Sequence, residues 1–317
     1  MHFKTRIRRS LANRVASKGA SDRINRAVVD RAASHYNCQV VYGAKVIDVH
    51  HGSNVIRIAN AEMVHVPHIA RDFDVFFSAV ASERDAELEI VDYSTPRIHR
   101  YHQLDLDLLI PSMQESIDVK AVYCPYTEPK AGDLVFDLGA NIGVVSIWLS
   151  RLVGSAGSIV SFEPDPRNLE CLEHNIAAAK ASNIRPVPAA LSAASGTALF
   201  FSEGSIGSGF RDLRADSMRP TTAGEQIEVQ TLSVSDAFSK YGVPAWIKID
   251  IEGAELEVLE SGLDVLKETM PSLAIETDHL RGSETTARRV EKLLESVGYA
   301  VKSDRVGGAQ MTWTLPQ

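Results

Sequence analysis

The chain has 317 residues, of which 44% are hydrophobic and 23% charged, with a mean hydropathy of −0.07 and a net charge of −8 at pH 7. No stretch approaches the roughly 20 apolar residues of a membrane-spanning helix, and the acidic balance argues against nucleic acid as a partner. Cys38, Cys124 and Cys171 lie far apart and form no CxxC pair. This spacing argues against a disulfide framework or a cysteine zinc site, and it predicts a cytoplasmic protein.

Residues 1–35 are predicted to form a basic helical arm. Residues 1–31 carry nine Lys or Arg side chains against two acids. Apolar residues recur there at every fourth position, as on one face of a helix: Phe3, Ile7, Leu11 and Val15. A second helix is predicted over 23–33. Such an arm could lie on the inner surface of an anionic membrane, contact a second copy of the chain, serve as a transit peptide or remain solvated.

Residues 36–131 are predicted to form a smaller β-rich region that contacts the substrate or a second subunit. β-Branched and aromatic stretches alternate there with Gly, Asn and charged residues, a pattern typical of short strands. The predicted strands are 39–49, 55–58, 63–67, 74–80, 87–93 and 119–126. Histidine pairs such as His65/His68 and His99/His102 have no obvious third ligand, so we expect exposed or hydrogen-bonded histidines rather than a metal site.

From residue 132 to 317 strands alternate with helices, which is typical of a doubly wound α/β domain with a mainly parallel sheet. The predicted strands are 134–137, 158–162, 184–188, 197–202, 225–232, 246–250, 272–276, 299–303 and 310–315. The predicted helices are 142–153, 166–180, 254–261 and 283–297, the third of them closed by Gly262. Ligands of such sheets bind at the carboxyl ends of the strands, so the residues after each strand are the candidates for function.

The first of these strands leads into the segment DLGANIG at 137–143. Gly139 can adopt a positive φ and lets a ligand approach the backbone, while Gly143 lets the next helix begin close to the strand. Asp137 is expected to place a carboxylate at the mouth of the site. Asn141 stands where the middle glycine of GxGxxG would be, and no GxxxxGK[ST] motif is present. The turn alone is therefore a weak signal, because such turns also occur without a ligand.

Acidic residues follow the later strands of the predicted sheet. Glu163 follows the second strand, 26 positions beyond Asp137, close to the spacing at which an acid binds ribose hydroxyls in nucleotide-binding folds. Its alternative role is to complement the dipole of the next helix, for which Asp165 competes better. Two further strand ends carry Asp250, Glu252, Glu276, Asp278 and His279. Acids gathered in this way destabilise the folded protein unless they are paired or bound to a cation, so they are retained there chiefly for such a role or for a reaction. Part of the set could be structural, with Lys248 neutralising Asp250.

Four motifs together resemble the FkbM family of S-adenosylmethionine-dependent methyltransferases. They are VFDLGANIG at 135–143, FEP at 162–164, AALS at 189–192 and IKIDIEGAE at 247–255. Their order and spacing match over roughly residues 133–301, and the last motif is the most particular to the family. The resemblance implies a class I methyltransferase fold, in which a mainly parallel seven-stranded sheet has its last strand inserted antiparallel. It also implies S-adenosylmethionine as the cofactor.

The resemblance further assigns roles to individual residues. The implied cofactor-binding residues are Asp137, Gly139, Asn141, Gly143, Glu163, Pro164 and Ala190. Among them Glu163 would hold the ribose. Ala190 lies in the region where other methyltransferases carry an adenine-side acid, so adenine contacts would be backbone and apolar.

Family members mostly methylate hydroxyl groups, often on sugars, so the resemblance implies an O-methyltransferase acting on a small molecule or glycan. A sugar hydroxyl needs a base or a metal to lose its proton. We expect Asp250, Glu276 and His279 to form the reaction centre, with His279 as the base. Asp250, Glu252 and Glu276 are expected ligands of Mg²⁺ or another divalent cation, because such cations prefer oxygen ligands. Asp250 and Glu276 lie at positions similar to those of the acids that hold a cation in neighbouring macrolide-sugar methyltransferases. Two alternatives stay open: an NAD(P)-dependent oxidoreductase and a non-catalytic nucleoside-binding module on the same fold.

Overall fold

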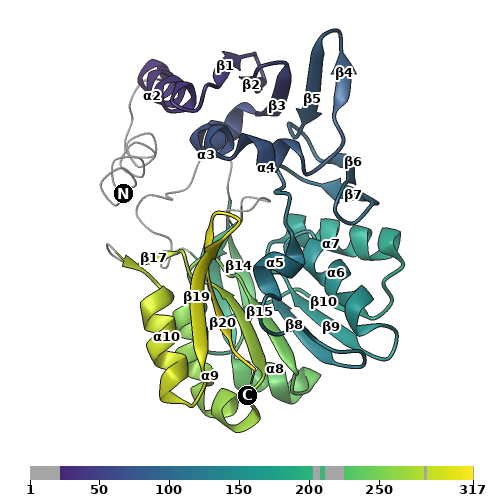
Figure 1. Cartoon of the computed structure of the whole chain (residues 1–317), viewed down its shortest axis with the longest axis vertical. Helices are drawn as coiled ribbons and strands as arrows, with labels where there is room; N and C mark the ends of the chain where they lie inside the picture. The colour runs from purple at the N-terminus through teal and green to yellow at the C-terminus, as the bar shows by residue number, and fades with distance from the viewer. Residues whose placement is uncertain (1–21, 203–207, 211–224, 282–283, 317) are drawn as a thin grey trace. The chain divides into compact units, whose positions relative to one another are not determined.

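The computed structural model describes residues 22–202, 208–210, 225–281 and 284–316 (Figure 1). The chain divides into two compact units, the first ending at Ser116 and the second beginning at Ile117. The boundary predicted at 131/132 lies inside the second unit, and the first helix predicted for the basic arm lies outside the described residues. No helix in the described ranges is long and apolar enough to cross a membrane.

The first unit contains a five-stranded sheet with helices packed against it. Its strands, in the spatial order β1-β2-β3-β5-β4, are β1 (Gln39–Tyr42), β2 (Val46–His51), β3 (Asn54–Ala59), β5 (Leu88–Asp92) and β4 (Glu83–Asp85). The helical elements are α2 (Asp22–Ser34), the 3₁₀ helix η1 (Asn60–His65), α3 (Val66–Arg71) and α4 (Phe73–Phe77). A separate antiparallel hairpin is formed by β6 (Arg97–Tyr101) and β7 (Leu106–Ile110). Helix α2 confirms the helix predicted over 23–33.

Two of the strands predicted in this unit, 63–67 and 74–80, are wrong. The chain there forms η1, α3 and α4. The buried residues of α3 and α4 recur at intervals of three or four, which is the period of a helix face and not of a strand: Val66, Ile69, Ala70, Phe73 and Phe76. Their aromatic and β-branched composition suggested strands, but the packing period decides the structure.

The second unit is built on a seven-stranded sheet in the order β10-β9-β8-β15-β16-β20-β19. The strands are β8 (Leu134–Leu138), β9 (Ser158–Phe162), β10 (Ile184–Val187), β15 (Trp246–Ile249), β16 (Ser272–Glu276), β19 (Val301–Val306) and β20 (Ala309–Thr314). The pairs from β10 to β16 are parallel, whereas β20 runs antiparallel to both of its neighbours. This is the doubly wound α/β sheet that the sequence predicts, with the last strand inserted antiparallel.

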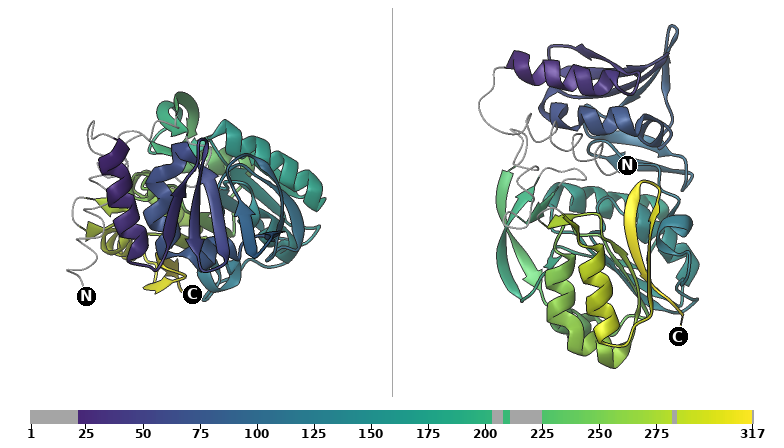
Figure 2. Two further views of the ribbon diagram at one scale, coloured as in Figure 1. Left: turned by 90° about the horizontal axis from the view of Figure 1, so that it is seen from above. Right: turned by 60° about the vertical axis from the view of Figure 1, so that its left-hand side comes forward.

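Helices cover both faces of this sheet. They are α5 (Val119–Tyr123), α6 (Val144–Val153), α7 (Pro166–Ala179), α8 (Val234–Tyr241), α9 (Glu255–Thr269) and α10 (Ala287–Ser296). Figures 1 and 2 show α8, α9 and α10 side by side on one face and α6 and α7 on the other. A smaller sheet of the order β11-β14-β12-β13 comprises β11 (Ala190–Leu191), β14 (Glu225–Leu232), β12 (Gly196–Ser202) and β13 (Gly209–Phe210). A short hairpin consists of β17 (Leu280–Arg281) and β18 (Glu284–Thr285).

Two local predictions in this unit need correction. The segment 119–126, predicted as a strand, contains helix α5, because Val119 and Tyr123 are buried four residues apart and the Asp118 side chain accepts a hydrogen bond from the backbone N–H of Ala121 at 3.0 Å. Helix α9 continues past Gly262 rather than ending there. A Cβ at Gly262 would lie 2.8 Å from the Val234 side chain of α8, so the glycine permits close helix packing instead of stopping the helix.

The parallel strands bring the predicted functional turns to one edge of the sheet. Asp137 in β8 pairs with Ser161 in β9 and with Lys248 in β15, so these three side chains lie next to one another across the sheet. The turns after β8, β9, β15 and β16 follow at the same carboxyl edge. A buried apolar core lies under this edge and includes Phe136, Ile249 and Ile275. The fold therefore supports the site on rigid strands.

Candidate active site

The turn between β8 and α6 is held in an unusual backbone conformation by two neighbouring elements. Gly139, Asn141 and Gly143 have φ angles of 78°, 50° and 91°. A Cβ at Gly139 would lie 1.9 Å from the backbone oxygen of Asp250, and a Cβ at Gly143 would lie 2.6 Å from Leu172 of α7. Position 139 therefore requires glycine because the turn after β15 lies directly against it. The sequence suggested instead that this glycine permits the approach of a ligand. Gly143 permits the close helix packing that was predicted.

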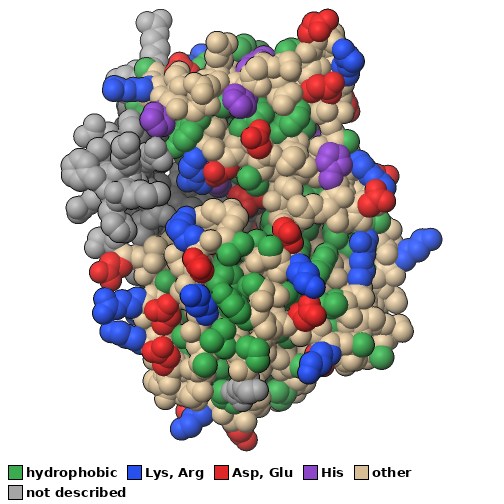
Figure 3. Space-filling view, viewed as in Figure 1, with side chains coloured by type: hydrophobic (Ala, Val, Ile, Leu, Met, Phe, Trp, Pro, Cys, Tyr) green, Lys and Arg blue, Asp and Glu red, His purple; other side chains and the backbone are tan. Residues whose placement is uncertain are grey.

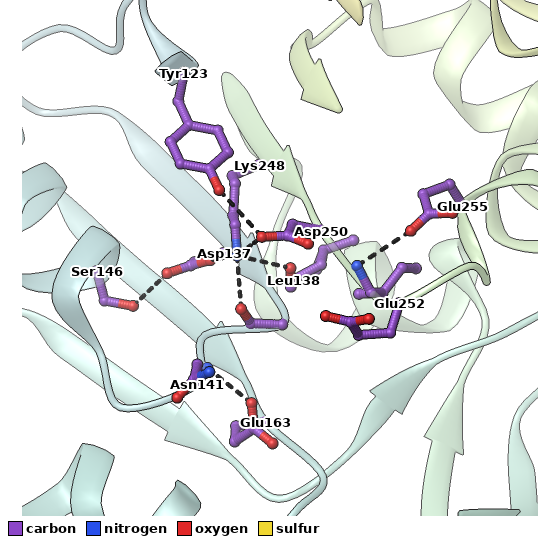
Figure 4. A network of polar contacts seen from close by, with 12 residues as sticks. Tyr123, Asp137, Leu138, Asn141, Ser146, Glu163, Lys248, Asp250, Glu252 and Glu255 are labelled. Carbon is purple, nitrogen blue, oxygen red and sulfur yellow. Dashed lines mark hydrogen bonds and ion pairs between the residues drawn. The ribbon is translucent and has the colours of Figure 1, made fainter. Parts of the chain in front are cut away.

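Asp137 lies beneath this turn and does not reach the mouth of the site, contrary to expectation. Its side chain is fully buried, and its Oδ2 accepts a hydrogen bond from Ser146 Oγ at 2.6 Å (Figure 4). Its Oδ1 is 3.2 Å from Nζ of Lys248. Lys248 also donates to the backbone oxygens of Leu138 and Gly139 at 3.3 and 2.6 Å. Asp137 and Lys248 thus form a buried ion pair that fixes the turn from below.

Glu163, at the end of β9, closes the other side of the turn. Its carboxylate accepts hydrogen bonds from the backbone N–H groups of Asn141 at 2.7 Å and Asp165 at 2.9 Å. Burial raises the pKa of Glu163 from 4.5 to about 7, because the two backbone donors offset only part of the lost hydration. The side chain of Asp165 caps α7 by accepting from the N–H of Arg167, so Glu163 is not the helix cap. Because Glu163 is buried but does not cap the helix, it is a candidate for ligand binding.

Asp250 follows β15 and is partly exposed, with a side-chain exposure of 23%. Tyr123 of α5 donates a hydrogen bond from its hydroxyl to Asp250 Oδ2 at 3.1 Å, and Lys248 Nζ lies 3.7 Å from the same oxygen. Burial, together with the charge of Asp250, raises the pKa of Tyr123 well above its ordinary value. Tyr123 therefore stays protonated and acts as a donor. No sequence pattern indicated it, because it lies 127 positions from Asp250 in a segment predicted as a strand.

His279 lies between two carboxylates of the β15–α9 turn. Its Nε2 is 3.4 Å from Glu252 Oε2 and its Nδ1 is 3.2 Å from Glu255 Oε1. Glu255 is fully buried and accepts from the backbone N–H groups of Ile251 and Gly253 at 3.3 and 3.0 Å. Burial disfavours the charged ring, but Glu255 and Glu252 outweigh it and raise the pKa of His279 well above its usual range. Both ring nitrogens thus face carboxylates, which favours the charged imidazolium over the free base that the sequence suggested.

Glu276, at the end of β16, lies close to other acids of the site. Burial and the neighbouring charges of Asp250 and Asp278 raise the pKa of Glu276 well above its ordinary range. Within the described residues, one group has ligand atoms converging within 4.8 Å: Glu276, Asp278 and His279. The predicted set of Asp250, Glu252 and Glu276 does not converge in this way. His279 also faces Glu252 and Glu255, so a cation bound at this group would compete with those two carboxylates for the ring.

The remaining predicted cofactor residues lie beside this cluster. Pro164 is half-buried directly after Glu163. Ala190 belongs to β11 and is buried in an apolar cluster with Phe200, Phe210 and Val229. Ala190 is thus surrounded by apolar side chains, as expected from the lack of an adenine-side acid in the sequence.

The histidines of the first unit form no comparable cluster. Figure 3 shows histidine side chains at separate points on that unit. His102 Nδ1 is 3.0 Å from the backbone oxygen of Ser78, and His68 Nε2 is 3.3 Å from Asp72 Oδ2. Across the described ranges, no group of potential metal ligands includes any of these histidines. Cys38, Cys124 and Cys171 are free and buried.

Comparison with known sequences identifies the family. Residues 137–301, more than half of the chain, match the family described as the methyltransferase FkbM domain. The chain belongs to the FkbM family of S-adenosylmethionine-dependent methyltransferases. Methyltransferase sdnD of Sordaria araneosa is 29% identical over an alignment of 198 positions that covers 54% of this chain and 75% of that protein. Membership of the FkbM family sets aside the alternative of an NAD(P)-dependent oxidoreductase.

Solved structures include another FkbM methyltransferase. The crystal structure of methyltransferase FkbM from Methylobacillus flagellatus has a TM-score of 0.46 and 15% identity, and the alignment covers 81% of this chain. This chain spans only 56% of the length of that structure. Fibrillarin of Aeropyrum pernix, crystallised with S-adenosylmethionine, has a TM-score of 0.39 and 13% identity over 87% of this chain and 98% of its own.

The residues of the FkbM site fit the cofactor of the family. The Glu163 carboxylate has about four lone-pair directions and accepts two backbone hydrogen bonds, so it retains acceptors for two ribose hydroxyls. The acids at the ends of β15 and β16 provide a negative environment suited to a sulfonium cation. The positive φ angles of Asn141 and Gly143 set the shape of the turn beside Glu163. Glu163, Asn141, Gly143 and Pro164 are therefore the residues that would hold the cofactor directly, while Asp137 and Gly139 support them.

Proposed function

We propose that this protein is an O-methyltransferase that transfers the methyl group of S-adenosylmethionine to a hydroxyl of a small molecule or glycan, most simply a sugar. The cofactor, when bound, supplies an activated methyl group, so the protein's main tasks are alignment and removal of the hydroxyl proton. The observation that carries the proposal is the pair of acids at the ends of β15 and β16. Asp250 and Glu276 are close enough that the charge of Asp250 raises the pKa of Glu276.

Glu276 is the proton acceptor in this proposal. A carboxylate with a raised pKa binds a proton more readily than an ordinary glutamate, which suits a general base near neutral pH. The acceptor oxygen forms a bond to the methyl carbon as the carbon–sulfur bond breaks, and its proton passes to Glu276. Asp250 accepts a hydrogen bond from a second hydroxyl of the acceptor molecule and thereby orients the reacting one. His279, which the sequence suggested as base, holds Glu252 and Glu255 instead.

The charge of the site favours hydroxyl acceptors that are not themselves anions. Asp250 and Glu252 have side-chain exposures of 23% and 29%. The two cations described beside them, Lys248 and His279, are already paired with buried carboxylates. A neutral polyol such as a sugar can donate several hydrogen bonds to such acids, whereas a phosphate or carboxylate would meet like charge.

A divalent cation at these acids is the second candidate for activating the hydroxyl. The convergence of Glu276 and Asp278 with His279 favours it, and Asp250, Glu252 and Glu276 are the ligands that the sequence predicts. Oxygen-rich ligand sets of this kind bind Mg²⁺ or Ca²⁺. The two candidates differ in one respect: proton transfer to Glu276 alone survives chelation, and cation-assisted transfer does not.

The test is a methyl-transfer assay with isotope-labelled S-adenosylmethionine against a panel of sugars, glycosides, other alcohols and amines. We expect labelled ethers from a hydroxyl compound, identified by mass spectrometry and NMR. Glu276→Gln should lower kcat by at least about 100-fold, as expected on losing a general base, while calorimetry shows unchanged cofactor affinity. Glu260→Gln, on the exposed face of α9, is the matched control. Labelled amines only, or full activity of Glu276→Gln, would contradict the proposal. Loss of activity in EDTA that is restored by Mg²⁺ would favour the cation.

A further inference from the structure

Helix α5 delivers one buried side chain, Tyr123, to the reaction centre and is itself firmly attached. Trp313 of β20 donates from Nε1 to the backbone oxygen of Val122 at 2.8 Å. At the other end, the side chain of Asp118 caps the helix through the N–H of Ala121. Tyr123 is 3% exposed and is directed at Asp250 in Figure 4. The position of its hydroxyl is therefore fixed by the sheet and not by a free surface loop.

One hydrogen-bond donor and one cation converge on the same oxygen of Asp250. The Tyr123 hydroxyl donates to Oδ2 at 3.1 Å, and the Lys248 ammonium lies 3.7 Å from that oxygen. The ammonium also lies 5.8 Å from the centre of the Tyr123 ring, so tyrosine, lysine and aspartate form one packed group. Among the described residues, no donor is found for Oδ1 of Asp250. Tyr123 and Lys248 both contact Oδ2. Because the carboxylate is planar, fixing Oδ2 also fixes Oδ1, which remains available to a ligand.

We infer that Tyr123 is a positioning residue that sets the rotation of the Asp250 carboxylate, so that Oδ1 accepts a hydrogen bond from a neighbouring hydroxyl of the acceptor molecule and holds the reacting hydroxyl in place. The inference rests on the proposed function, in which Asp250 orients the acceptor. Lys248 alone cannot set this rotation, since it is shared with Asp137 and two backbone oxygens. A hydroxyl held in line with the methyl group reacts far faster than one that rotates freely. Tyr123 does not touch the reacting atoms and acts through Asp250.

The test compares Tyr123→Phe with Tyr126→Phe in the full chain. The two changes remove the same hydroxyl, but Tyr126 is 40% exposed and its ring packs on Trp313. For Tyr123→Phe we expect kcat to fall about tenfold or more, the cost of losing a hydrogen bond to a charged group, with unchanged cofactor affinity by calorimetry. Tyr126→Phe should match the parent. Equal losses in both variants, or a loss confined to cofactor affinity, would overturn the inference.

Two further measurements separate positioning from general support. Combining Tyr123→Phe with Asp250→Asn should be no worse than Asp250→Asn alone, because Tyr123 acts only through that carboxylate. Additive losses would refute the inference. Crystal structures of the parent and Tyr123→Phe should show the Asp250 carboxylate rotated in the variant; an unchanged carboxylate would also refute it. This comparison needs no substrate, so it still decides the role of Tyr123 if no hydroxyl compound is methylated and the proposed function fails.

Discussion

Replacing Glu163 by glutamine should make the stability of the cofactor-free protein less dependent on pH and should weaken cofactor binding. Burial raises the pKa of Glu163 from 4.5 to about 7. Between these two pH values the folded chain holds a proton that the unfolded chain has released. The folded state then binds more protons than the unfolded state, so the parent loses stability as pH rises through this window. Glutamine does not titrate and lacks this loss.

The size of the effect follows from the pKa of Glu163. One pKa unit corresponds to about 1.4 kcal/mol, so a rise from 4.5 to about 7 costs the parent about 3 kcal/mol above pH 7. Between pH 5 and pH 8 the unfolding free energy of Glu163→Gln should therefore rise by about 2–3 kcal/mol relative to the parent. Glutamine offers one acceptor oxygen where the carboxylate offers two, so the N–H of Asn141 or Asp165 loses its partner. That loss adds a constant term and leaves the pH dependence unchanged.

The assay is urea unfolding of parent and variant at pH 5 and pH 8 without cofactor, followed by calorimetric titration with S-adenosylmethionine. Glu170→Gln on the exposed face of α7 is the control and should follow the parent. Cofactor affinity of the parent should fall as pH drops below about 7, whereas that of Glu163→Gln should be at least about tenfold weaker at pH 8 and independent of pH. If the unfolding free energies of parent and Glu163→Gln change equally with pH, the raised pKa of Glu163 is refuted. If the two proteins bind S-adenosylmethionine equally well, the binding of the ribose by Glu163 is refuted.

Two substitutions test the support beneath the turn. Gly139→Ala should destabilise the protein by roughly 2–4 kcal/mol in urea unfolding, because its Cβ would lie 1.9 Å from the Asp250 oxygen. Gly132→Ala, with φ 90° and open space around it, isolates the backbone strain and should cost only about 1 kcal/mol; equal losses would refute the clash. Lys248→Met should cost about 3–5 kcal/mol by leaving Asp137 buried and unpaired. Adding Asp137→Asn should recover part of that loss, and an unrecovered loss would contradict the ion-pair account.

The alternation of strands and helices, together with the positions of the acids, was enough to predict the main sheet of the second unit and its functional edge. Alternating strands and helices predict the sheet, and a parallel sheet brings Glu163, Asp250 and Glu276 to one edge whatever the details of packing. Partners within that edge could not be predicted in the same way. The Tyr123 contact depends on how a five-residue helix packs, and such a short amphipathic segment is ambiguous between helix and strand. The pairing of His279 with Glu255 likewise depends on where α9 begins.

Burial, rather than position in the sequence, separates the two roles that acids play in this site. Asp137 lies within the end of β8 and Glu255 begins α9, close to the acids that follow the strands, yet each of these two is fully buried and faces a cation. A buried ionised carboxylate needs such a partner, so these acids are committed to holding their turns. Asp250 and Glu252 keep about a quarter of their side chains exposed, at 23% and 29%, and retain oxygens for a ligand. The same KxDxEGAE segment thus supplies both the rigid support and the reactive edge. A substitution in it should therefore change stability or turnover according to the exposure of the residue concerned.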